Sequence, residues 1–562
     1  MKTLKYFVLM LLAVSICVEE SLACTNLIVG RKASKDGSVI CTYNCDGFGF
    51  AGCLSYSPAG RHTQGEKIAI DGWGPRKEGQ FVDQVDYTYG VIGMMNEKQV
   101  SIVETTFDGR LELVNEEGLL DYYTLMQLAL QRSTTAREAI QWMTDLVEDY
   151  GYSSSGETIT ICDKEEAWIM EIIGKGSGRK GAVWVALRVP DDCICAHANL
   201  SRIRQFPLHD NDNCLYAKDV ISFAREKGYY TGKDSDFSFR DAYCPIDFEN
   251  VRYADARVYS FFRHHVADKA EMDQYLPYLN GDFAQCDHLP LWIKPDTLVD
   301  VKGIMADMRD HFEDTPLDMT TDVSAGPWGM PIRPLPMTYK DSEGNPMFRE
   351  RPIATQQSCM TMVCQMRSWL PDEVGGVLWF NCDDAGMVAY VPVFCATNVV
   401  PDPFRRENNP HREFSKKSAF WMNNFVANMI YPRYSLMIGD LHDAQNELEG
   451  YYVADLDSVA KTIFPMTRGE RITYLTRKSA AYAERMMTRW DSLARMLIVK
   501  YNDLVVYPTE DGTYTEGGYQ TPGYNPSSHA AREAATNLIN LSNGVNDNQR
   551  KVMDIDWADC RI

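Results

Sequence analysis

The most informative stretch of the chain is residues 21–30, which read Ser21-Leu22-Ala23-Cys24-Thr25-Asn26-Leu27-Ile28-Val29-Gly30. Its Ser-Leu-Ala segment has the small-x-small pattern at which a secretory leader is cut. Cleavage after Ala23 would make Cys24 the first residue of the mature protein and would place a thiol and a free α-amino group on one residue. Because these groups titrate near pH ~8.5 and ~8, the amine can serve as the base for the thiol. We therefore predict that Cys24 is a nucleophile.

Residues 1–23 have the three parts of a signal peptide: a positively charged start, an apolar run over residues 7–18 and the cleavage pattern. The apolar run is too short to span a bilayer comfortably. Two alternatives stay open, an uncut membrane anchor and a lipoprotein whose acylated Cys24 could not act as a nucleophile. Ser21 stands where a lipoprotein leader would have Leu, and two glutamates follow the apolar run, so the leader favours plain cleavage. We expect an exported protein, periplasmic or extracellular, with a lipid-anchored form as the alternative.

The composition limits the partners of the protein. A net charge of −22 makes nucleic acid and anionic membrane surfaces poor partners. The 562 residues are enough for a large core, and no run after the leader is long and apolar enough for a transmembrane helix. We expect small substrates, no nucleic acid and no stable membrane insertion after leader removal, while an oligomer stays possible.

The cysteines favour disulfides over a metal site. Of 16 cysteines one lies in the leader, so an odd number remains in the mature chain. Exported proteins tend to pair their thiols, and the odd count leaves Cys24 as the candidate free thiol, with up to seven bridges among the others. The closely spaced cysteines lack the usual spacing of zinc ligands: Cys41 with Cys45, Cys193 with Cys195, and Cys359 with Cys364. We therefore expect no metal.

Residues 25–46 predict a β-hairpin. Thr25–Gly30 is a β-rich run, Lys35–Ser38 is a turn signal, and Val39–Asp46 is a second β-rich run. In such a hairpin Asp46, at the end of the second strand, returns toward Cys24 at the start of the first. The pattern therefore predicts a carboxylate near the N-terminal amine.

The remaining chain predicts hairpins first and helices later. The predicted hairpins are 87–106, 158–173, 183–199 and 376–394. The predicted helices are 119–132, 135–150, 300–312, 418–432, 455–464, 476–501 and 527–541. Thr135 and Glu138 suggest a capping box, and Gly151 marks a helix end. The Pro- and Gly-rich residues 315–336 predict a long surface loop. This order predicts an α+β protein in which stacked sheets lie between layers of helices.

Several short motifs resemble the bacterial dipeptidase A family, a branch of the N-terminal-nucleophile (Ntn) hydrolases. The motifs are Cys24-Thr25, Ala33–Ser38, Tyr43–Asp46, Gly93–Glu97, Glu104–Thr106, Ala167–Glu171, Arg188–Asp192, Ala196–Asn199, Arg367–Pro371 and Gly375–Phe380. The resemblance implies an αββα four-layer sandwich over residues 24–430. It leaves residues 431–562 as a helical region packed on that domain.

The resemblance also implies roles for individual residues. Cys24 would attack an amide carbonyl, Asp46 would orient the α-amino group, and Asn199 would help to hold the oxyanion, where negative charge develops. Tyr43 stands where many relatives carry Arg. Arg202 and Arg367 are therefore candidates for supplying positive charge and for binding the substrate.

Structural roles for several of these residues stay open. Asp46 could be a turn residue, Asn199 a helix cap and Arg367 a structural ion-pair partner.

The resulting hypothesis is a secreted cysteine dipeptidase that needs no cofactor. Two alternatives remain. One is an amidase acting on N-acyl amino acids or on bile-salt or penicillin-like amides. The other is a non-catalytic surface lipoprotein that binds peptides. The sequence leaves open the preferred dipeptide, the residues that read the substrate termini, the disulfide pairing and the oligomeric state.

Overall fold

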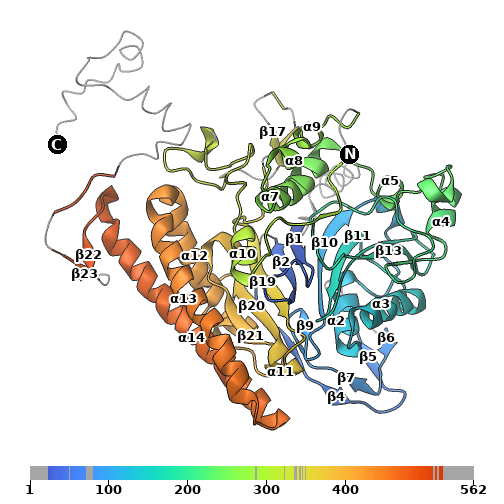
Figure 1. Ribbon diagram of the computed structural model, residues 1–562, viewed down its shortest axis with the longest axis horizontal. Coiled ribbons are helices and arrows are strands. Elements are labelled where there is room, and N and C mark those ends of the chain that lie inside the picture. The colour runs from blue at the N-terminus through green and yellow to red at the C-terminus, as the bar shows by residue number, and fades with distance from the viewer. Residues whose placement is uncertain are drawn as a thin grey trace, which may run out of the picture. The chain divides into compact units, whose positions relative to one another are not determined.

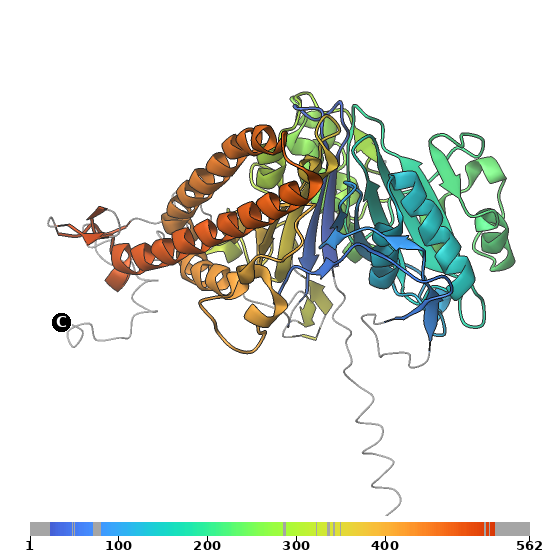
Figure 2. The same ribbon diagram turned by 90° about the horizontal axis from the view of Figure 1, so that it is seen from below.

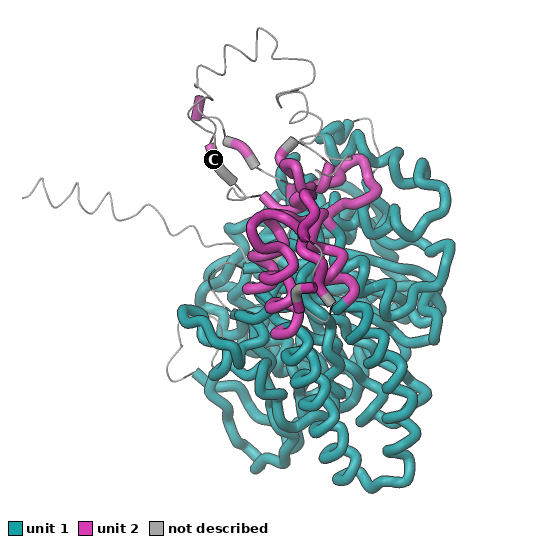
Figure 3. The backbone as a smooth tube through the Cα atoms, turned by 90° about the vertical axis from the view of Figure 1, so that its left-hand side faces the viewer, with its two compact units in different colours: residues 1–310, 351–424, 444–490 teal, residues 311–350, 425–443, 491–562 magenta. Residues whose placement is uncertain are grey.

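The computed structural model describes residues 23–47, 49, 51–70, 80–284, 288–321, 323–333, 338–340, 343–344, 346–348, 350–510, 513–515 and 518–522 (Figure 1). Residues 1–22 of the predicted leader and the predicted helix 527–541 lie outside the described residues. The chain divides into two compact units, coloured separately in Figure 3. Unit 1 comprises residues 1–310, 351–424 and 444–490, and unit 2 comprises the remainder. Among the described residues no helix has the length and apolar character needed to cross a membrane.

Unit 1 is built on two large antiparallel sheets. The first has seven strands in the order β16 (Trp292–Ile293), β14 (Ile194–His197), β1 (Ala23–Val29), β2 (Val39–Asp46), β19 (Ser358–Met366), β20 (Gly376–Cys382) and β21 (Val391–Phe394). The second has eight strands in the order β15 (Cys214–Tyr216), β13 (Ala182–Arg188), β12 (Ala167–Gly174), β11 (Gly156–Cys162), β10 (Ser101–Asp108), β9 (Met95–Asn96), β8 (Val91–Ile92) and β3 (Tyr56–Ser57).

The two sheets pack face to face, with β1 and β2 of the first against β10 and β11 of the second. Helices cover the outer faces (Figure 2). Helices α2 (Tyr122–Arg132) and α3 (Ala136–Tyr150) lie on the second sheet. On the first sheet lie parts of α13 (Tyr434–Ile463) and α14 (Arg468–Lys500). Glu449 of α13 accepts a hydrogen bond from the backbone N–H of Tyr390, and Ser479 of α14 accepts one from the backbone N–H of Phe394. The predicted α+β class is confirmed. Strands β2, β11, β12 and β20 are buried along their whole length, and the nearly continuous apolar character of β12 and β20 follows from this burial.

The helices confirm the predicted positions but differ at their ends. Asp121 caps α2, so this helix begins three residues later than predicted. Thr135 caps α3 and Gly151 ends it at φ 82°, as predicted. The capping box is incomplete, however, because Glu138 accepts from the backbone of Thr134 rather than from that of Thr135.

The later helices differ in length from the prediction. Helices α10 (Val301–Asp307) and α12 (Ala419–Ile430) begin one residue later than predicted and end before the predicted residues 312 and 432. Helices α13 (Tyr434–Ile463) and α14 (Arg468–Lys500) extend well beyond the predicted 455–464 and 476–501. The missed turns are rich in polar residues, which weakened the apolar periodicity on which the prediction depended.

The hairpin predicted over residues 183–199 is wrong. Strand β13 pairs with β12 and β15 in the second sheet, whereas β14 pairs with β1 and β16 in the first. The Pro190–Asp192 segment carries the chain between the sheets and contacts Gly30, where a Cβ atom would lie 2.4 Å from the Asp191 carbonyl oxygen. The turn signal was correct, but the sequence could not distinguish a turn within one sheet from a crossing between two.

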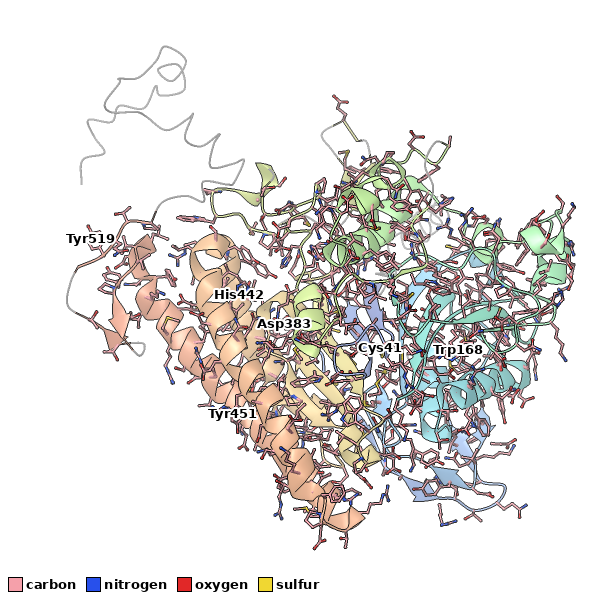
Figure 4. All side chains as sticks on the ribbon, viewed as in Figure 1. Cys41, Trp168, Asp383, His442, Tyr451 and Tyr519 are labelled. Atoms are coloured by element: carbon pink, nitrogen blue, oxygen red, sulfur yellow. The ribbon has the colours of Figure 1, made fainter. Side chains whose placement is uncertain are left out.

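The disulfides expected from the cysteine count are not found in the described part of the chain. All 13 cysteines that the structure describes are free thiols, and most are buried. Cys41, labelled in Figure 4, lies opposite Cys364 on the neighbouring strand and close to Cys162 of the other sheet. These thiols pack as small apolar side chains in the core.

Unit 2 has contacts of its own. The backbone of Ser435 donates to the Trp328 carbonyl oxygen at 2.9 Å, and Lys500 forms an ion pair with Asp440 at 2.7 Å. The predicted surface loop 315–336 belongs to this unit, and its described residues contain one short 3₁₀ turn, Val323–Ala325.

Candidate active site

The first hairpin brings Cys24, at the start of β1, and Asp46, at the end of β2, to the same end of these two central strands. Strands β1 and β2 pair antiparallel, with Cys24 opposite Cys45 and Ala23 opposite Asp46. This register confirms the hairpin predicted over residues 25–46. A chain cut after Ala23 would begin beside the backbone of Asp46.

The thiol of Cys24 points into the space between the sheets. Its Sγ lies 3.6 Å from the Tyr43 hydroxyl and 3.6 Å from Oε1 of Glu104, which belongs to β10 of the facing sheet. The Tyr43 hydroxyl donates to the same Glu104 oxygen at 2.6 Å. Cys24, Tyr43 and Glu104 are all buried. The thiol is therefore held against a phenol and a carboxyl group.

Glu104 is one of two buried acids behind the thiol. Glu157, on the neighbouring strand β11, accepts from the Thr106 hydroxyl at 2.9 Å. The Oε2 atoms of Glu104 and Glu157 have no donor among the described residues, and a single proton shared between the two carboxyl groups would satisfy both. Burial raises the pKa of Glu104, and burial together with the charge of Glu104 raises the pKa of Glu157 well above its ordinary value. Both shifts disfavour the simultaneous ionisation of the two carboxyl groups.

This environment disfavours the thiolate while the chain is uncut. Burial, followed by the neighbouring Cys45 and the charge of Glu104, raises the pKa of the Cys24 thiol well above its ordinary value. Because the thiolate is the nucleophile, the thiol needs a base close by.

A positively charged side chain, that of Arg257, contacts the main chain of Cys24. Arg257 lies in the first turn of α7 (Ala256–His264), directly after a π-helical turn over Val251–Asp255. Its Nη1 donates to the Cys24 carbonyl oxygen at 2.8 Å and to Thr25 Oγ1 at 2.6 Å, and its Nη2 donates to Asn199 Oδ1 at 2.8 Å. Burial, and then the charge of Arg351, lowers the pKa of Arg257. The planar guanidinium thus joins β1 to the end of β14.

A second arginine links Asn199 to Asp46. Arg351 donates to Asn199 Oδ1 at 3.3 Å and to Asp46 Oδ2 at 2.5 Å. The other carboxylate oxygen of Asp46 accepts from the Ser358 hydroxyl. Asp46, Arg257 and Arg351 are buried, whereas Asn199 is partly exposed. Burial raises the pKa of Asp46, although Arg351 and Ser358 oppose that shift.

Asn199 has a donor left for a ligand. Within the described part of the chain its Nδ2 donates one hydrogen bond, to the Thr106 carbonyl oxygen at 2.7 Å, and a side-chain amide nitrogen carries two hydrogens. Its Oδ1 accepts from both arginines, which fixes the orientation of the amide.

The structure does not bring Arg202 or Arg367 to Cys24. Arg202 forms a fully buried ion pair with Asp255 at 2.7 Å. Arg367 follows the end of β19 that lies beside Val39, and it donates to two carbonyl oxygens of helix α11 (Asp372–Gly375). That end of β19 is about 20 Å along the strand from the row that contains Cys24. The positive charge at the cluster comes instead from Arg257 and Arg351.

Sequence reasoning missed both of these arginines. Arg257 lies within the mainly apolar stretch 256–262, all of whose residues are buried. A charged residue in such a stretch is a usable signal, because charged side chains are rarely buried without a function or a partner. Arg351 gives no such signal, since it precedes β19 in an irregular segment. Its place beside Asp46 results from the pairing of β2 with β19 across more than 300 residues of sequence.

Among the residues that the structure describes, no group of three or more His, Cys, Asp or Glu side chains could hold a metal ion. The cluster combines a buried thiol at the start of the first hairpin, a carboxylate at the end of the same hairpin, two guanidinium groups and an oriented amide. These groups suit attack on a carbonyl carbon and stabilisation of the negative charge that develops on its oxygen.

The profile of peptidase family C69 matches residues 74–447 of the chain. The matched residues include Asn199, Arg257 and Arg351, whereas Cys24 and Asp46 precede them.

Curated proteins are similar over longer stretches. A protein named "Probable dipeptidase" from Latilactobacillus sakei is 23% identical over 509 residues, which cover 86% of this chain and 96% of the relative. "Dipeptidase A" from Lactobacillus helveticus is 25% identical over 458 residues, with 75% of this chain and 84% of the relative covered. A "Probable dipeptidase" from Salmonella dublin is 25% identical over 389 residues, with 66% and 81% covered.

Proposed function

The chain belongs to peptidase family C69 and is a peptide-bond hydrolase, and from this premise we propose that it is an exported dipeptidase whose nucleophile is Cys24. The observation that carries the proposal is the connection of Asp46 and Asn199, through Arg351 and Arg257, to the main chain of Cys24. The sequence already indicates Cys24, Asp46 and Asn199, of which Asn199 lies far from the other two in the chain. A purely structural role for each would not require them to converge.

The proposed reaction begins with the α-amino group that cleavage after Ala23 would create. The amine takes the proton from Sγ of Cys24, and the thiolate attacks the carbonyl carbon of the peptide bond. The second N–H of Asn199 donates to the resulting oxyanion. The ammonium then returns its proton to the leaving amine as the C–N bond breaks, which leaves a thioester on Cys24. Water, deprotonated by the same amine, hydrolyses the thioester and restores the thiol.

Asp46 and the arginines have separate proposed roles. Asp46 is the register partner of Ala23, so its carboxylate would lie close to the new ammonium and stabilise it. Arg257 fixes the backbone of Cys24 and Thr25 and, with Arg351, orients Asn199. We assign these three as positioning residues and Cys24 and Asn199 as the catalytic ones.

The fold and the leader are consistent with this assignment. Two facing sheets between helices, with the nucleophile at the start of a central strand, support an Ntn-hydrolase four-layer sandwich. Residues 1–23 would then be a leader whose removal activates the enzyme during export. The names of the curated relatives support dipeptides as substrates, and the full burial of Cys24 leaves little space for a long polypeptide.

The deciding experiment compares two forms of the purified protein. In one, Cys24 is the first residue; in the other, an uncleavable extension precedes it. We expect only the first form to hydrolyse dipeptides, because a thiol inside the chain has no adjacent amine to accept its proton. Removing the extension with a site-specific protease should restore activity, and prior alkylation with iodoacetamide should prevent the recovery.

Cys24→Ala, processed in the same way, is the matched control for contaminating peptidases. Full activity of the extended protein, with its intact N-terminus confirmed by mass spectrometry, would rule out the mechanism. Faster turnover of bile-salt conjugates or penicillins than of dipeptides would instead favour the amidase alternative.

A further inference from the structure

A cavity of about 730 Å³ in unit 1 lies beside the candidate active site. Its volume falls within the roughly 300–1,000 Å³ typical of small-molecule sites. Most of its wall is apolar, and the largest apolar side chains are Leu54, Met94, Tyr123, Met360, Met362 and Phe380. Such a wall favours an apolar side chain of a ligand.

Strand register places this cavity next to Cys24. Cys24 is opposite Cys45 on β2, and Cys45 is opposite Met360 on β19. Directly opposed residues in a sheet project from the same face, so Met360 projects from the face that carries the thiol. Two strand spacings separate Cys24 from Met360, about 10 Å. A ligand group in contact with Met360 lies up to about 4 Å nearer to Cys24, so the side chain of the residue after the scissile carbonyl can reach it from a carbonyl held at Cys24.

The wall nearest the thiol is shaped by a β-bulge. The register between β2 and β19 shifts between Ser358 and Met360, which leaves Cys359 unpaired in the ladder. Residues 51–55 lie against this bulge, and a Cβ atom on Gly52 would come within 2.0 Å of the Cys359 carbonyl oxygen. Only glycine permits that approach, so the segment that forms this side of the cavity is fixed close to the catalytic edge of the sheet.

The charged residues that line the cavity also limit which ligands it can bind. The described residues that line the cavity include no Asp or Glu and a single Arg or Lys, which is Arg406. Arg406 is exposed, so its guanidinium can meet a ligand without first being desolvated. In a chain with a net charge of −22, a wall with this balance favours an anion. The planar guanidinium matches a carboxylate in particular.

We infer that this cavity binds the C-terminal residue of the substrate, and that the preferred dipeptides end in a large apolar amino acid whose free carboxylate pairs with Arg406. The inference rests on the proposed function, since it takes Cys24 as the point of attack. It adds a class of substrate, dipeptides that end in residues such as leucine, methionine or phenylalanine. It also assigns Arg406 to recognition of the substrate carboxylate.

The test uses the processed full-length enzyme and three substrates: alanyl-leucine, alanyl-leucinamide and alanyl-glycine. The wild type should prefer alanyl-leucine to its amide by about tenfold or more in kcat/KM, because the amide removes the charge that Arg406 would bind. Arg406→Met should abolish this preference. Arg412→Met is the matched control, since Arg412 is also exposed and lies six residues away but does not line the cavity.

A second variant tests the apolar wall. Ala51 lines the cavity and is partly exposed, so Ala51→Trp would fill space without removing a core side chain. It should lower the ratio of kcat/KM for alanyl-leucine to that for alanyl-glycine by about tenfold. Thermal unfolding of each variant shows whether it is folded.

The outcomes separate the two levels of inference. If the wild type hydrolyses no dipeptide, the proposed function fails and the inference fails with it. If dipeptides are hydrolysed but Arg406→Met keeps the preference for the free carboxylate, or Ala51→Trp leaves the ratio unchanged, the proposed function stands and the assignment of this cavity is overturned.

Discussion

Asp46→Asn should destabilise the protein as well as inactivate it. Asp46 Oδ2 and Arg351 Nη2 are 2.5 Å apart, and their side chains are 0% and 4% exposed. Removing one partner of a buried ion pair costs about 3–5 kcal/mol, because the other charge remains buried without compensation. Arg351 would in addition face Arg257 across Asn199 without the acid that offsets their repulsion. We therefore expect the free energy of unfolding to fall by about 3–5 kcal/mol.

A double-mutant cycle separates the ion pair from the two side chains that form it. Arg351→Met alone should cost a similar amount, because it leaves the Asp46 carboxylate unpaired. The double variant removes both charges, so its loss should be smaller than the sum of the single losses by about 2 kcal/mol. Urea unfolding followed by circular dichroism measures all four proteins. The exposed pair Arg489–Glu447, with an N–O distance of 2.7 Å and side chains 25% and 52% exposed, is the control, and its cycle should give about 0.2–1 kcal/mol.

Activity completes this test. Measured well below the unfolding midpoint, Asp46→Asn should retain the fold and still lose orders of magnitude in turnover, because an orienting carboxylate is lost. An unchanged midpoint for Asp46→Asn, or strictly additive single losses, would refute the argument from the buried pair. Wild-type turnover in the folded variant would refute the positioning role.

Three further predictions concern neighbouring groups. Arg257→Lys keeps the charge but loses the planar fork between Cys24 and Asn199, so kcat/KM should fall by about 10²–10³; a wild-type value would contradict the role of Arg257. Glu104→Gln removes a negative charge beside the thiol, so the pH profile of Cys24 alkylation by iodoacetamide should move to lower pH; an unchanged profile would contradict the influence of Glu104. His197 is buried between Thr105 and Thr160, and burial lowers its pKa from 6.5 to about 3. The contribution of the neutral imidazole to the free energy of unfolding is therefore present above pH 6.5 and is lost as the pH falls from 6.5 to 3. The loss should reach roughly 4–5 kcal/mol, and acid titration of the unfolding free energy should be flatter in this window for His197→Gln than for the wild type.

Local patterns in the sequence were enough to predict much of the scaffold. The hairpin over residues 25–46 has a turn signal between two β-rich runs, and its register follows from the short connection, so the approach of Asp46 to Cys24 was predictable. The ends of α3 were predictable for a similar reason, because Thr135 and Gly151 act on their own helix. Asn199 was identified through the resemblance, and the structure places it in line with Cys24, beyond the pair of Asn26 with His197.

The misses concern contacts between segments far apart in the chain. Whether the turn at Pro190–Asp192 stays within one sheet depends on β1, which lies some 160 residues earlier. For the same reason the sequence did not indicate that Arg257 and Arg351 contact Cys24 and Asp46, and substrate binding by Arg202 and Arg367 stays a prediction. A positive charge near Cys24 was expected, but which arginine supplies it is decided by the placement of α7 and by the pairing of β19 with β2. The charge of Arg257 within an apolar helical stretch is a local signal, whereas the pairing of β19 with β2 leaves none.

The charges around Cys24 are divided between its two sides, and this division explains why the reaction would wait for cleavage. The acids Glu104 and Glu157 lie on the side of the thiol, whereas Arg257 contacts the carbonyl oxygen of the same residue. In the uncut chain burial and the charge of Glu104 disfavour the thiolate, and the arginine donates to main-chain carbonyl oxygens, to Thr25 and to Asn199. A new α-amine changes this balance, because the ammonium that forms when it takes the proton is stabilised by Asp46 on β2 and by the acids behind the thiol. The thiolate would then form as part of an ion pair rather than as an isolated buried charge, which removes most of the desolvation penalty that raises the pKa of Cys24. The acids that disfavour the Cys24 thiolate before cleavage would therefore favour transfer of its proton to the α-amine afterwards.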